Sequence, residues 1–133
     1  MATADQASGL RTPLHTLHVE LGAKMVLFAG YDMPVQFPGG IIQEHRHTRD
    51  QVGLFDVSHM GQILIRGQNA AESLERVVPL DVTSMANNHQ AYTVLTNDQG
   101  GILDDLIVTR WSADGFFLVV NAARKAQDRK SVV

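Results

Sequence analysis

In the first third of the chain, the order of apolar and polar residues predicts two helices with an extended segment between them. A threonine and a proline open the stretch 12–22, three leucines follow at helical spacing and a glycine closes it, which predicts a short helix. The apolar stretch 24–37 is interrupted by glycine, aspartate and proline, so we expect it to be extended and broken by a turn. The polar stretch 41–51 predicts a mostly exposed helix that ends at Gly53.

The middle of the chain predicts a strand followed by a second helix. Residues 62–66 alternate between isoleucine and other side chains, which indicates a strand that Gly67 ends. Asn69 is a candidate N-cap, and Glu72, three residues later, could complete a capping box. We expect the helix behind them to end at Pro79.

The last third of the chain predicts three strands joined by two short turns, at 91–96, 101–111 and 116–121. An antiparallel meander is the simplest arrangement of such strands. The unbroken apolar run 116–120 predicts a central strand that is buried on both faces, under helices or under another domain. The fold class we expect is therefore α+β, an antiparallel sheet with flanking helices.

Composition narrows the class of protein further. The 133 residues suffice for one compact domain or a piece of a larger protein, and 44% hydrophobic residues predict a folded core. A net charge of −3 without a dense basic block disfavours a nucleic-acid partner. Without cysteine the chain can have no disulfide, thiolate metal site or cysteine nucleophile. The sequence shows no targeting segment in its first ten residues and no membrane-spanning run, so we expect a cytoplasmic protein.

Six histidines raise the question of a metal site. His45 and His47 are two apart on a predicted helix and diverge, while His15 and His18 have no third ligand that the sequence identifies. We therefore expect no metal. His59 could act as a general base, but no nucleophile is fixed near it, and a structural role is the preferred interpretation.

Two neighbouring acids in a predicted strand are the more informative feature. Because strand side chains alternate between faces, Asp104 and Asp105 point to opposite sides of a sheet that is otherwise rich in isoleucine, leucine and valine. A carboxylate on a buried or ligand-facing side is costly without a partner. The alternative is that Asp104 is solvated and Asp105 caps a turn or meets an arginine. The residues alone thus indicate a candidate site without a substrate.

Several motifs resemble, in order, the aminomethyltransferase or T-protein family of the glycine cleavage system. They are residues 11–14 (RTPL), 18–26 (HVELGAKMV), 28–36 (FAGYDMPVQ), 53–61 (GLFDVSHMG) and 100–108 (GGILDDLIV). The resemblance extends from about Leu10 to Ala126.

The resemblance implies an incomplete part of a three-domain, folate-binding fold. Residues 1–57 would start the first folate-binding domain, and residues 58–127 would form an incomplete second-domain sheet and helix. Residues 128–133 depart from the family pattern, lack an apolar face at helical spacing and are similar to a translated sequencing adapter. We expect this tail to be non-native.

The resemblance also implies a site. The family aspartate that faces the pterin matches Asp105, which we expect to be the catalytic residue. The matching positions that line the folate pocket are Met60, Leu64, Tyr92 and Asn121. Val119 and Val120 match sheet positions beside Asn121, and Thr109 stands where some relatives carry an aromatic residue.

The reaction implied is transfer of an aminomethyl group from the lipoyl arm of H-protein to tetrahydrofolate, with release of ammonia. Tetrahydrofolate is then a co-substrate, lipoylated H-protein the partner, and no metal is needed. We expect the chain by itself to be inactive. The alternatives are another folate-dependent member of the superfamily, either a demethylase or an iron–sulfur or tRNA maturation protein, or a truncated product without activity.

Overall fold

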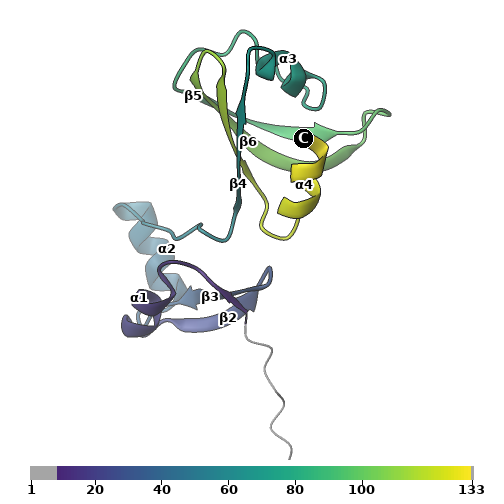
Figure 1. The fold of residues 1–133 in the computed structure, drawn as a ribbon. Coiled ribbons are helices and arrows are strands. Elements are labelled where there is room, and N and C mark those ends of the chain that lie inside the picture. Colours follow the sequence, from purple (N-terminus) through teal and green to yellow (C-terminus); the bar gives the residue numbers. More distant parts are fainter. Residues whose placement is uncertain (1–8, 133) are drawn as a thin grey trace, which may run out of the picture. The chain divides into compact units, whose positions relative to one another are not determined.

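The computed structural model describes residues 9–132, and the chain divides into two compact units between His59 and Met60 (Figure 1). Residues 1–8, where we expected no targeting segment, and Val133 of the expected tail lie outside the described residues. The assignment of the units to domains of a longer enzyme stays a prediction.

The first unit is a small three-stranded sheet with two helices. Its elements are β1 (Leu10–Arg11), α1 (His15–Glu20), β2 (Lys24–Phe28), β3 (Tyr31–Gln36) and α2 (Ile41–Asp50). β2 and β3 form an antiparallel hairpin, and β1 pairs with β3 in parallel. Ala29 and Gly30 both have positive φ at the hairpin turn, so the extended segment with a turn is confirmed.

Helix α1 forms where the sequence predicts it, but its buried side chains are not the leucines at helical spacing. Leu14, Leu17 and Leu21, the apolar positions at helical spacing, are 43%, 45% and 55% exposed. The buried side chains are instead His15 and His18, each of which meets a carboxylate from a distant part of the chain. Polar pairing rather than apolar packing therefore orients this helix.

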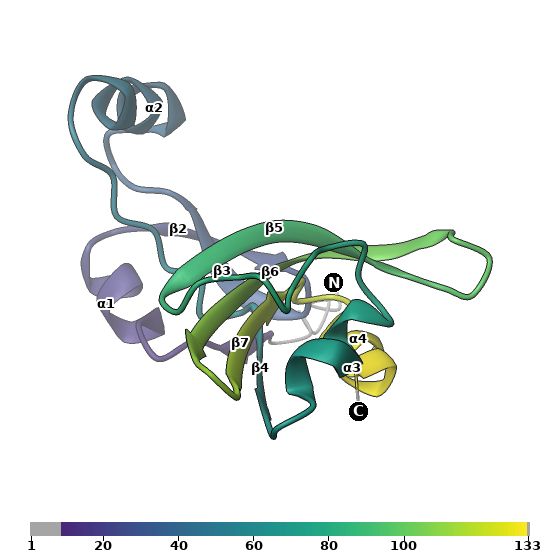
Figure 2. The same cartoon turned by 90° about the horizontal axis from the view of Figure 1, so that it is seen from above.

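The second unit is a four-stranded antiparallel sheet with helices on one side. Its elements are β4 (Gly61–Arg66), α3 (Ala70–Glu75), β5 (His89–Thr96), β6 (Ile102–Ser112), β7 (Gly115–Val120) and α4 (Lys125–Val132). The strand order is β4-β7-β6-β5, and α3 and α4 lie on the same side of the sheet (Figure 2). The predicted meander and the α+β class are confirmed.

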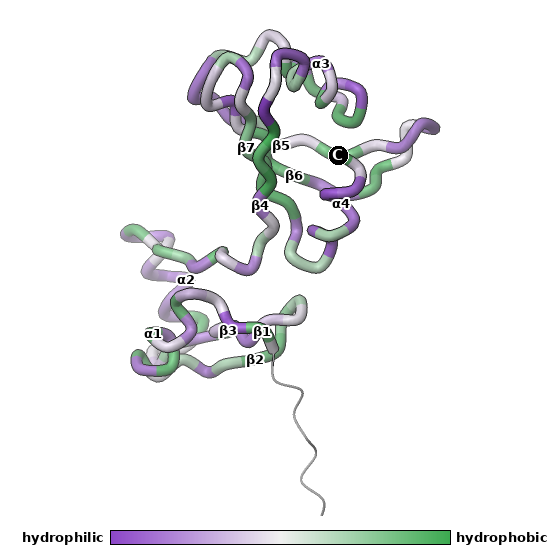
Figure 3. Tube along the Cα trace, in the orientation of Figure 1, coloured by the Kyte–Doolittle hydropathy of each residue, from purple (hydrophilic) through white to green (hydrophobic). Residues whose placement is uncertain are grey.

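One face of this sheet forms the core of the unit. Leu106, Val108, Phe116 and Leu118 are 2% exposed or less and pack with Leu74 of α3. The tube of Figure 3 shows hydrophobic residues concentrated along these strands. A helix-covered sheet face of this kind excludes water from one side of every strand.

The other face of the sheet is more open than the sequence predicts. Phe117 and Val119 alternate with the buried residues of β7 and are only half-buried. Within this unit the run 116–120 is therefore fully buried on one face only, and cover of the other face by another domain stays a prediction. β7 is central as predicted. On this face of the sheet, β7 presents the half-buried apolar side chains of Phe117 and Val119.

The ends of α3 and α4 also differ from expectation. Asn69 is the N-cap of α3, but its side chain makes no capping hydrogen bond, so the capping box with Glu72 is wrong. Helix α4 continues to Val132 and buries Asp128. The interpretation of residues 128–133 as a non-native tail stays a prediction. Among the helices of residues 9–132, none has the length and apolar character needed to cross a membrane.

Candidate functional site

Three polar side chains meet at one end of the open face of the second sheet. The Tyr92 hydroxyl donates a 2.6 Å hydrogen bond to Oδ2 of Asp105, and Nδ2 of Asn121 donates to Oδ1 at 3.0 Å. Tyr92 lies on β5, Asp105 on β6, and Asn121 directly after β7. The sheet therefore gathers three of the residues that the sequence singles out.

The register of the strands explains why these residues meet. Asp105 pairs with Val94, two residues after Tyr92, so the phenol and the carboxylate lie diagonally on one face. Leu106 pairs with Val120, which places Asn121 beside Asp105 on the other flank. The carboxylate is thus bracketed by donors from both neighbouring strands.

The Asp105 carboxylate is held in its ionised form. The hydrogen bond from Tyr92, together with that from Asn121, holds the pKa of Asp105 below its usual range. The same contact with an anion raises the pKa of the Tyr92 hydroxyl, which keeps its proton. At neutral pH the site therefore offers one fixed negative charge next to a neutral donor.

Asp104 points to the opposite, helix-covered side, as strand alternation requires. Its Oδ1 accepts a 3.0 Å hydrogen bond from Nδ2 of Asn121, while its Oδ2 is buried without a hydrogen-bond partner in the described residues. Burial, followed by the proximity of Asp104, raises the pKa of Asp128 to about 6. The alternative in which Asp104 is solvated is therefore wrong.

The remaining sequence-predicted positions lie along the same sheet. Leu64 on β4 is 53% exposed and pairs with Phe117, which in turn pairs with Thr109. Met60 immediately precedes Gly61, the partner of Val120, and Asn121 immediately follows Val120. The side chains of Leu64 and Met60 are apolar, so they contribute apolar surface to this sheet.

The chemistry open to this arrangement is orientation and charge stabilisation. An ionised carboxylate with two bracketing donors accepts a further N–H or stabilises a developing positive charge nearby. No group of three or more histidine, cysteine, aspartate or glutamate side chains among residues 9–132 is arranged to hold a metal ion.

A second polar cluster, in the first unit, was missed from the sequence. Asp56 accepts hydrogen bonds from the Thr12 hydroxyl at 3.0 Å and from the backbone N–H of Ser58 at 2.9 Å, and Nε2 of His18 lies 2.9 Å from its Oδ2. Burial raises the pKa of Asp56, but these hydrogen bonds outweigh burial and hold it well below its usual range. The sequence feature that could have indicated this cluster is Asp56 itself, an acidic residue between two apolar residues.

His59 lies among aromatic rings of the same unit. Its ring centroid is 5.7 Å from that of Phe28 and 6.3 Å from that of Tyr31, both in edge-to-face geometry. Together with Met33 and Pro34 it lines a cavity of about 300 Å³. These contacts agree with the structural role preferred for this histidine.

Comparison with known proteins identifies similar chains. The model of the family described as "GCVT N-terminal domain" matches residues 14–132. A mitochondrial aminomethyltransferase of Dictyostelium discoideum is 46% identical over 118 residues, which are 89% of this chain and 29% of that protein. An aminomethyltransferase of Halothermothrix orenii is 46% identical over 118 residues, 89% of this chain and 33% of that protein.

A solved structure shares the fold. The crystal structure of glycine cleavage system aminomethyltransferase T from Bartonella henselae superposes with a TM-score of 0.89 at 42% identity and covers 94% of this chain and 35% of that one. The chain thus spans about a third of the length of the curated relatives it matches.

Proposed function

Because the chain belongs to the GCVT N-terminal domain family, we propose that it supplies the folate-facing sheet of an aminomethyltransferase of the glycine cleavage system. The substrates are tetrahydrofolate and the aminomethyl group carried on the lipoyl arm of H-protein. The products are methylenetetrahydrofolate, ammonia and the reduced lipoyl arm. The relatives named above, all aminomethyltransferases, support this assignment.

The observation that carries the proposal is the state of Asp105. A carboxylate that is bracketed by Tyr92 and Asn121 keeps its negative charge and its orientation on an open sheet face. The reaction joins a weakly basic ring nitrogen to a carbon that becomes cationic as ammonia leaves. A fixed anion beside these atoms favours the cationic intermediates and orients the N–H of the folate ring.

The other residues have supporting roles in this proposal. Tyr92 and Asn121 position Asp105, and Met60 and Leu64 add apolar wall against the pterin. Tetrahydrofolate is consumed as a co-substrate, and no step requires a metal. We propose a cytoplasmic location, and we propose that the chain alone does not catalyse, since its sheet face is open in this unit.

The test is a pair of substitutions in a complete enzyme. The chain is joined to the remaining two thirds of the Halothermothrix orenii aminomethyltransferase, and folate-dependent release of ammonia from aminomethylated H-protein is measured. Asp105→Asn should lower turnover by about a hundredfold, because it removes the charge and keeps the shape. Asp104→Asn is the matched control and should keep most of the activity.

Equal activity of the two variants would contradict the assignment of Asp105. Activity with a methylated amine instead of H-protein would favour the demethylase alternative. Some activity should remain in Asp105→Asn, since binding and proximity survive the loss of one charge.

A further inference from the structure

Three buried carboxyl oxygens lie on the helix-covered side of the second sheet without a hydrogen-bond donor. Asp128 of α4 is 1% exposed, and both of its side-chain oxygens are buried without a hydrogen-bond partner among residues 9–132. The same holds for Oδ2 of Asp104 on β6. The two carboxyl groups are close enough for a hydrogen bond if one of them carries a proton. Two buried acids therefore meet with no donor between them.

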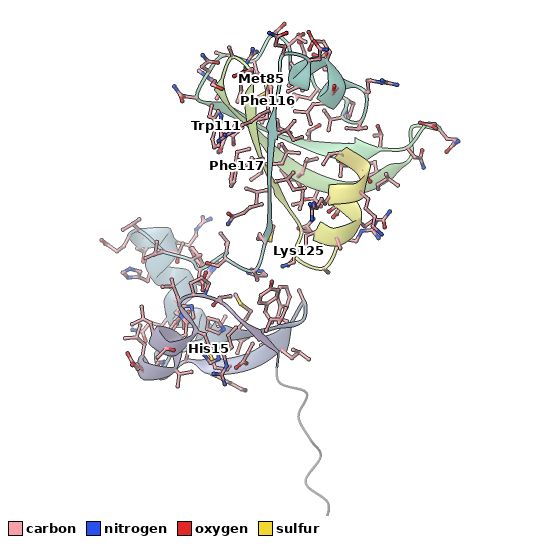
Figure 4. All side chains as sticks on the ribbon, viewed as in Figure 1. His15, Met85, Trp111, Phe116, Phe117 and Lys125 are labelled. Atoms are coloured by element: carbon pink, nitrogen blue, oxygen red, sulfur yellow. The ribbon has the colours of Figure 1, made fainter. Side chains whose placement is uncertain are left out.

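The connection after β7 brings these two acids together. The backbone N–H of Arg124 donates to the carbonyl oxygen of Asn121 at 3.1 Å, so the chain turns directly after the strand and α4 begins at Lys125. Figure 4 shows Lys125 at this end of the helix. A Cβ atom at Gly61 would overlap the Lys125 side chain, so α4 packs closely on β4 there. This packing holds Asp128, three residues later, against the sheet.

Asn121 connects the buried pair to the candidate site. Its Nδ2 atom donates to Oδ1 of Asp104 and to Oδ1 of Asp105, each at 3.0 Å. A side-chain amide nitrogen carries two hydrogens, so both bonds form at once. Asp105 in turn accepts a hydrogen bond from the Tyr92 hydroxyl. One proton between Asp104 and Asp128 would therefore complete a hydrogen-bond chain from α4 to the open face of the sheet.

The charged groups around Asp128 do not supply the missing donor. On β6 and at the start of α4 they are two acids and two basic residues: Asp104, Asp105, Arg124 and Lys125. Arg124 is exposed and donates to a backbone carbonyl oxygen of β6 at 3.4 Å. β4 has no charged side chain before Arg66 at its other end. Arg76, after α3, and Asp98, in the β5–β6 turn, line a separate cavity.

We propose that Asp128 is a positioning residue of the candidate site: its protonated carboxyl donates to Oδ2 of Asp104 and completes this hydrogen-bond chain to Asp105. The chain of hydrogen bonds lies within the second unit, whereas its role in turnover rests on the proposed function. With Asp104 held from both sides, the Asn121 amide keeps the orientation in which it donates to Asp105. This role makes Asp128 part of the native fold, so we expect a non-native tail to begin only after it.

The hydrogen-bond chain depends on pH because its donor is an acid. Burial and the adjacent Asp104 raise the pKa of Asp128 to about 6, so the proton is held below this pH and released above it. After release, two carboxylates repel each other and Asn121 loses a fixed partner. Asp128→Asn keeps a donor to Asp104 at every pH. Asp104→Asn also preserves the chain, because its amide accepts from Asn121 and donates to Asp128.

Carboxyl ¹³C NMR titration of the whole chain tests for the shared proton. In the parent chain the Asp105 signal should show, besides its own titration, a second step near pH 6, where the buried pair loses its proton. Asp128→Asn should abolish this second step. Asp98→Asn, at an exposed acid in the β5–β6 turn, is the matched control and should keep it. The titration is run in sodium chloride and in choline chloride at equal concentration.

The role in turnover is tested in the complete enzyme, in which this chain is joined to the remainder of the Halothermothrix orenii protein. The ratio of turnover by Asp128→Asn to turnover by the parent should rise by about threefold between about pH 5.5 and pH 8, because only the parent loses its donor. Asp98→Asn should give a ratio that does not change with pH.

A second step that persists in Asp128→Asn, or that is missing from the parent chain, would overturn the inference. A midpoint that is lower in sodium than in choline would overturn it too, because a bound cation would then compete for the pair. A constant turnover ratio for Asp128→Asn would overturn the positioning role. If the second step is lost in Asp128→Asn but the complete parent enzyme releases no ammonia with tetrahydrofolate, the shared proton stands and the proposed function is wrong.

Discussion

Nε2 of His18 lies 2.9 Å from Oδ2 of Asp56, a residue 38 positions later in the chain. The contact is buried, since the two side chains are 9% and 3% exposed. An ionised carboxylate only accepts hydrogen bonds, so His18 donates through Nε2. The pair therefore fastens the segment after α2 to helix α1 within the first unit.

The first prediction concerns this contact. Asp56→Asn should lower the free energy of unfolding at pH 7 by about 1 to 3 kcal/mol, because the charged acceptor of three hydrogen bonds is lost. Asp50→Asn, an exposed acid at the end of α2, should change it by less than about 0.5 kcal/mol. Urea unfolding followed by circular dichroism measures both.

The pH dependence of the same variant has a definite sign. The pKa of Asp56 is lower in the folded chain than in the unfolded chain, so its contribution is complete above about pH 4. The contribution is lost as the pH falls through the folded value. The difference between the parent chain and Asp56→Asn should therefore shrink on acidification, and a constant difference would contradict the assignment.

How far the sequence predicts the fold differs between the two units. The β5–β6–β7 meander follows from alternation and turn residues, which are local signals. The burial of His15 and His18 does not, because their partners Asp32 and Asp56 lie far along the chain. Local periodicity places the leucines of α1 on one face, but long-range polar pairs orient the helix in this unit.

For the candidate site, too, local patterns predict one part and long-range strand pairing determines the rest. Strand alternation separates Asp104 from Asp105, but it does not say which face is covered by helices. The bracketing of Asp105 by Tyr92 and Asn121 depends on the register of three strands, which single-chain patterns do not fix. The choice of Asp105 came from the family resemblance.

The second prediction concerns the ionisation of Asp105. Tyr92→Phe removes the 2.6 Å hydrogen bond to its carboxylate and should raise the pKa of Asp105 toward its ordinary value. Carboxyl ¹³C NMR titration of the folded chain measures this shift. The signal of Asp56, in the other unit, serves as control and should titrate alike in both proteins. An unchanged titration of Asp105 would show that Tyr92 does not set its charge.

The third prediction concerns Asp128, whose carboxyl oxygens are buried without a hydrogen-bond partner in the described residues. Burial and the neighbouring Asp104 raise its pKa to about 6, with Arg124 and Asp105 also facing the group. A group whose pKa is raised on folding stabilises the chain while it is protonated, and this stability is lost as the pH rises from about 4 through about 6.

Asp128→Asn removes that dependence. The variant should be more stable than the parent chain at pH 7.5, by on the order of 1 kcal/mol, and little different at pH 4.5. Asp98→Asn, in the exposed turn between β5 and β6, should show no such pH dependence. Urea midpoints at the two pH values measure the effect, and equal gains at both would contradict it.

The last prediction compares how much two arginines stabilise the fold: Arg110, near the end of β6, and Arg66, at the end of β4. Arg110 donates hydrogen bonds of 2.8 to 2.9 Å to the carbonyl oxygens of Thr83, Met85 and Ala113, so it fastens the loop before β5 to the turn after β6. Arg110→Met should lower the free energy of unfolding by about 1 to 2 kcal/mol, because three backbone carbonyl oxygens lose their charged donor. Arg66→Met loses only an exposed stacking contact with Trp111 and should cost less than about 1 kcal/mol. Urea unfolding followed by Trp111 fluorescence compares the two. Equal losses would contradict the prediction and would mean that Arg66 stabilises the fold as much as Arg110 does.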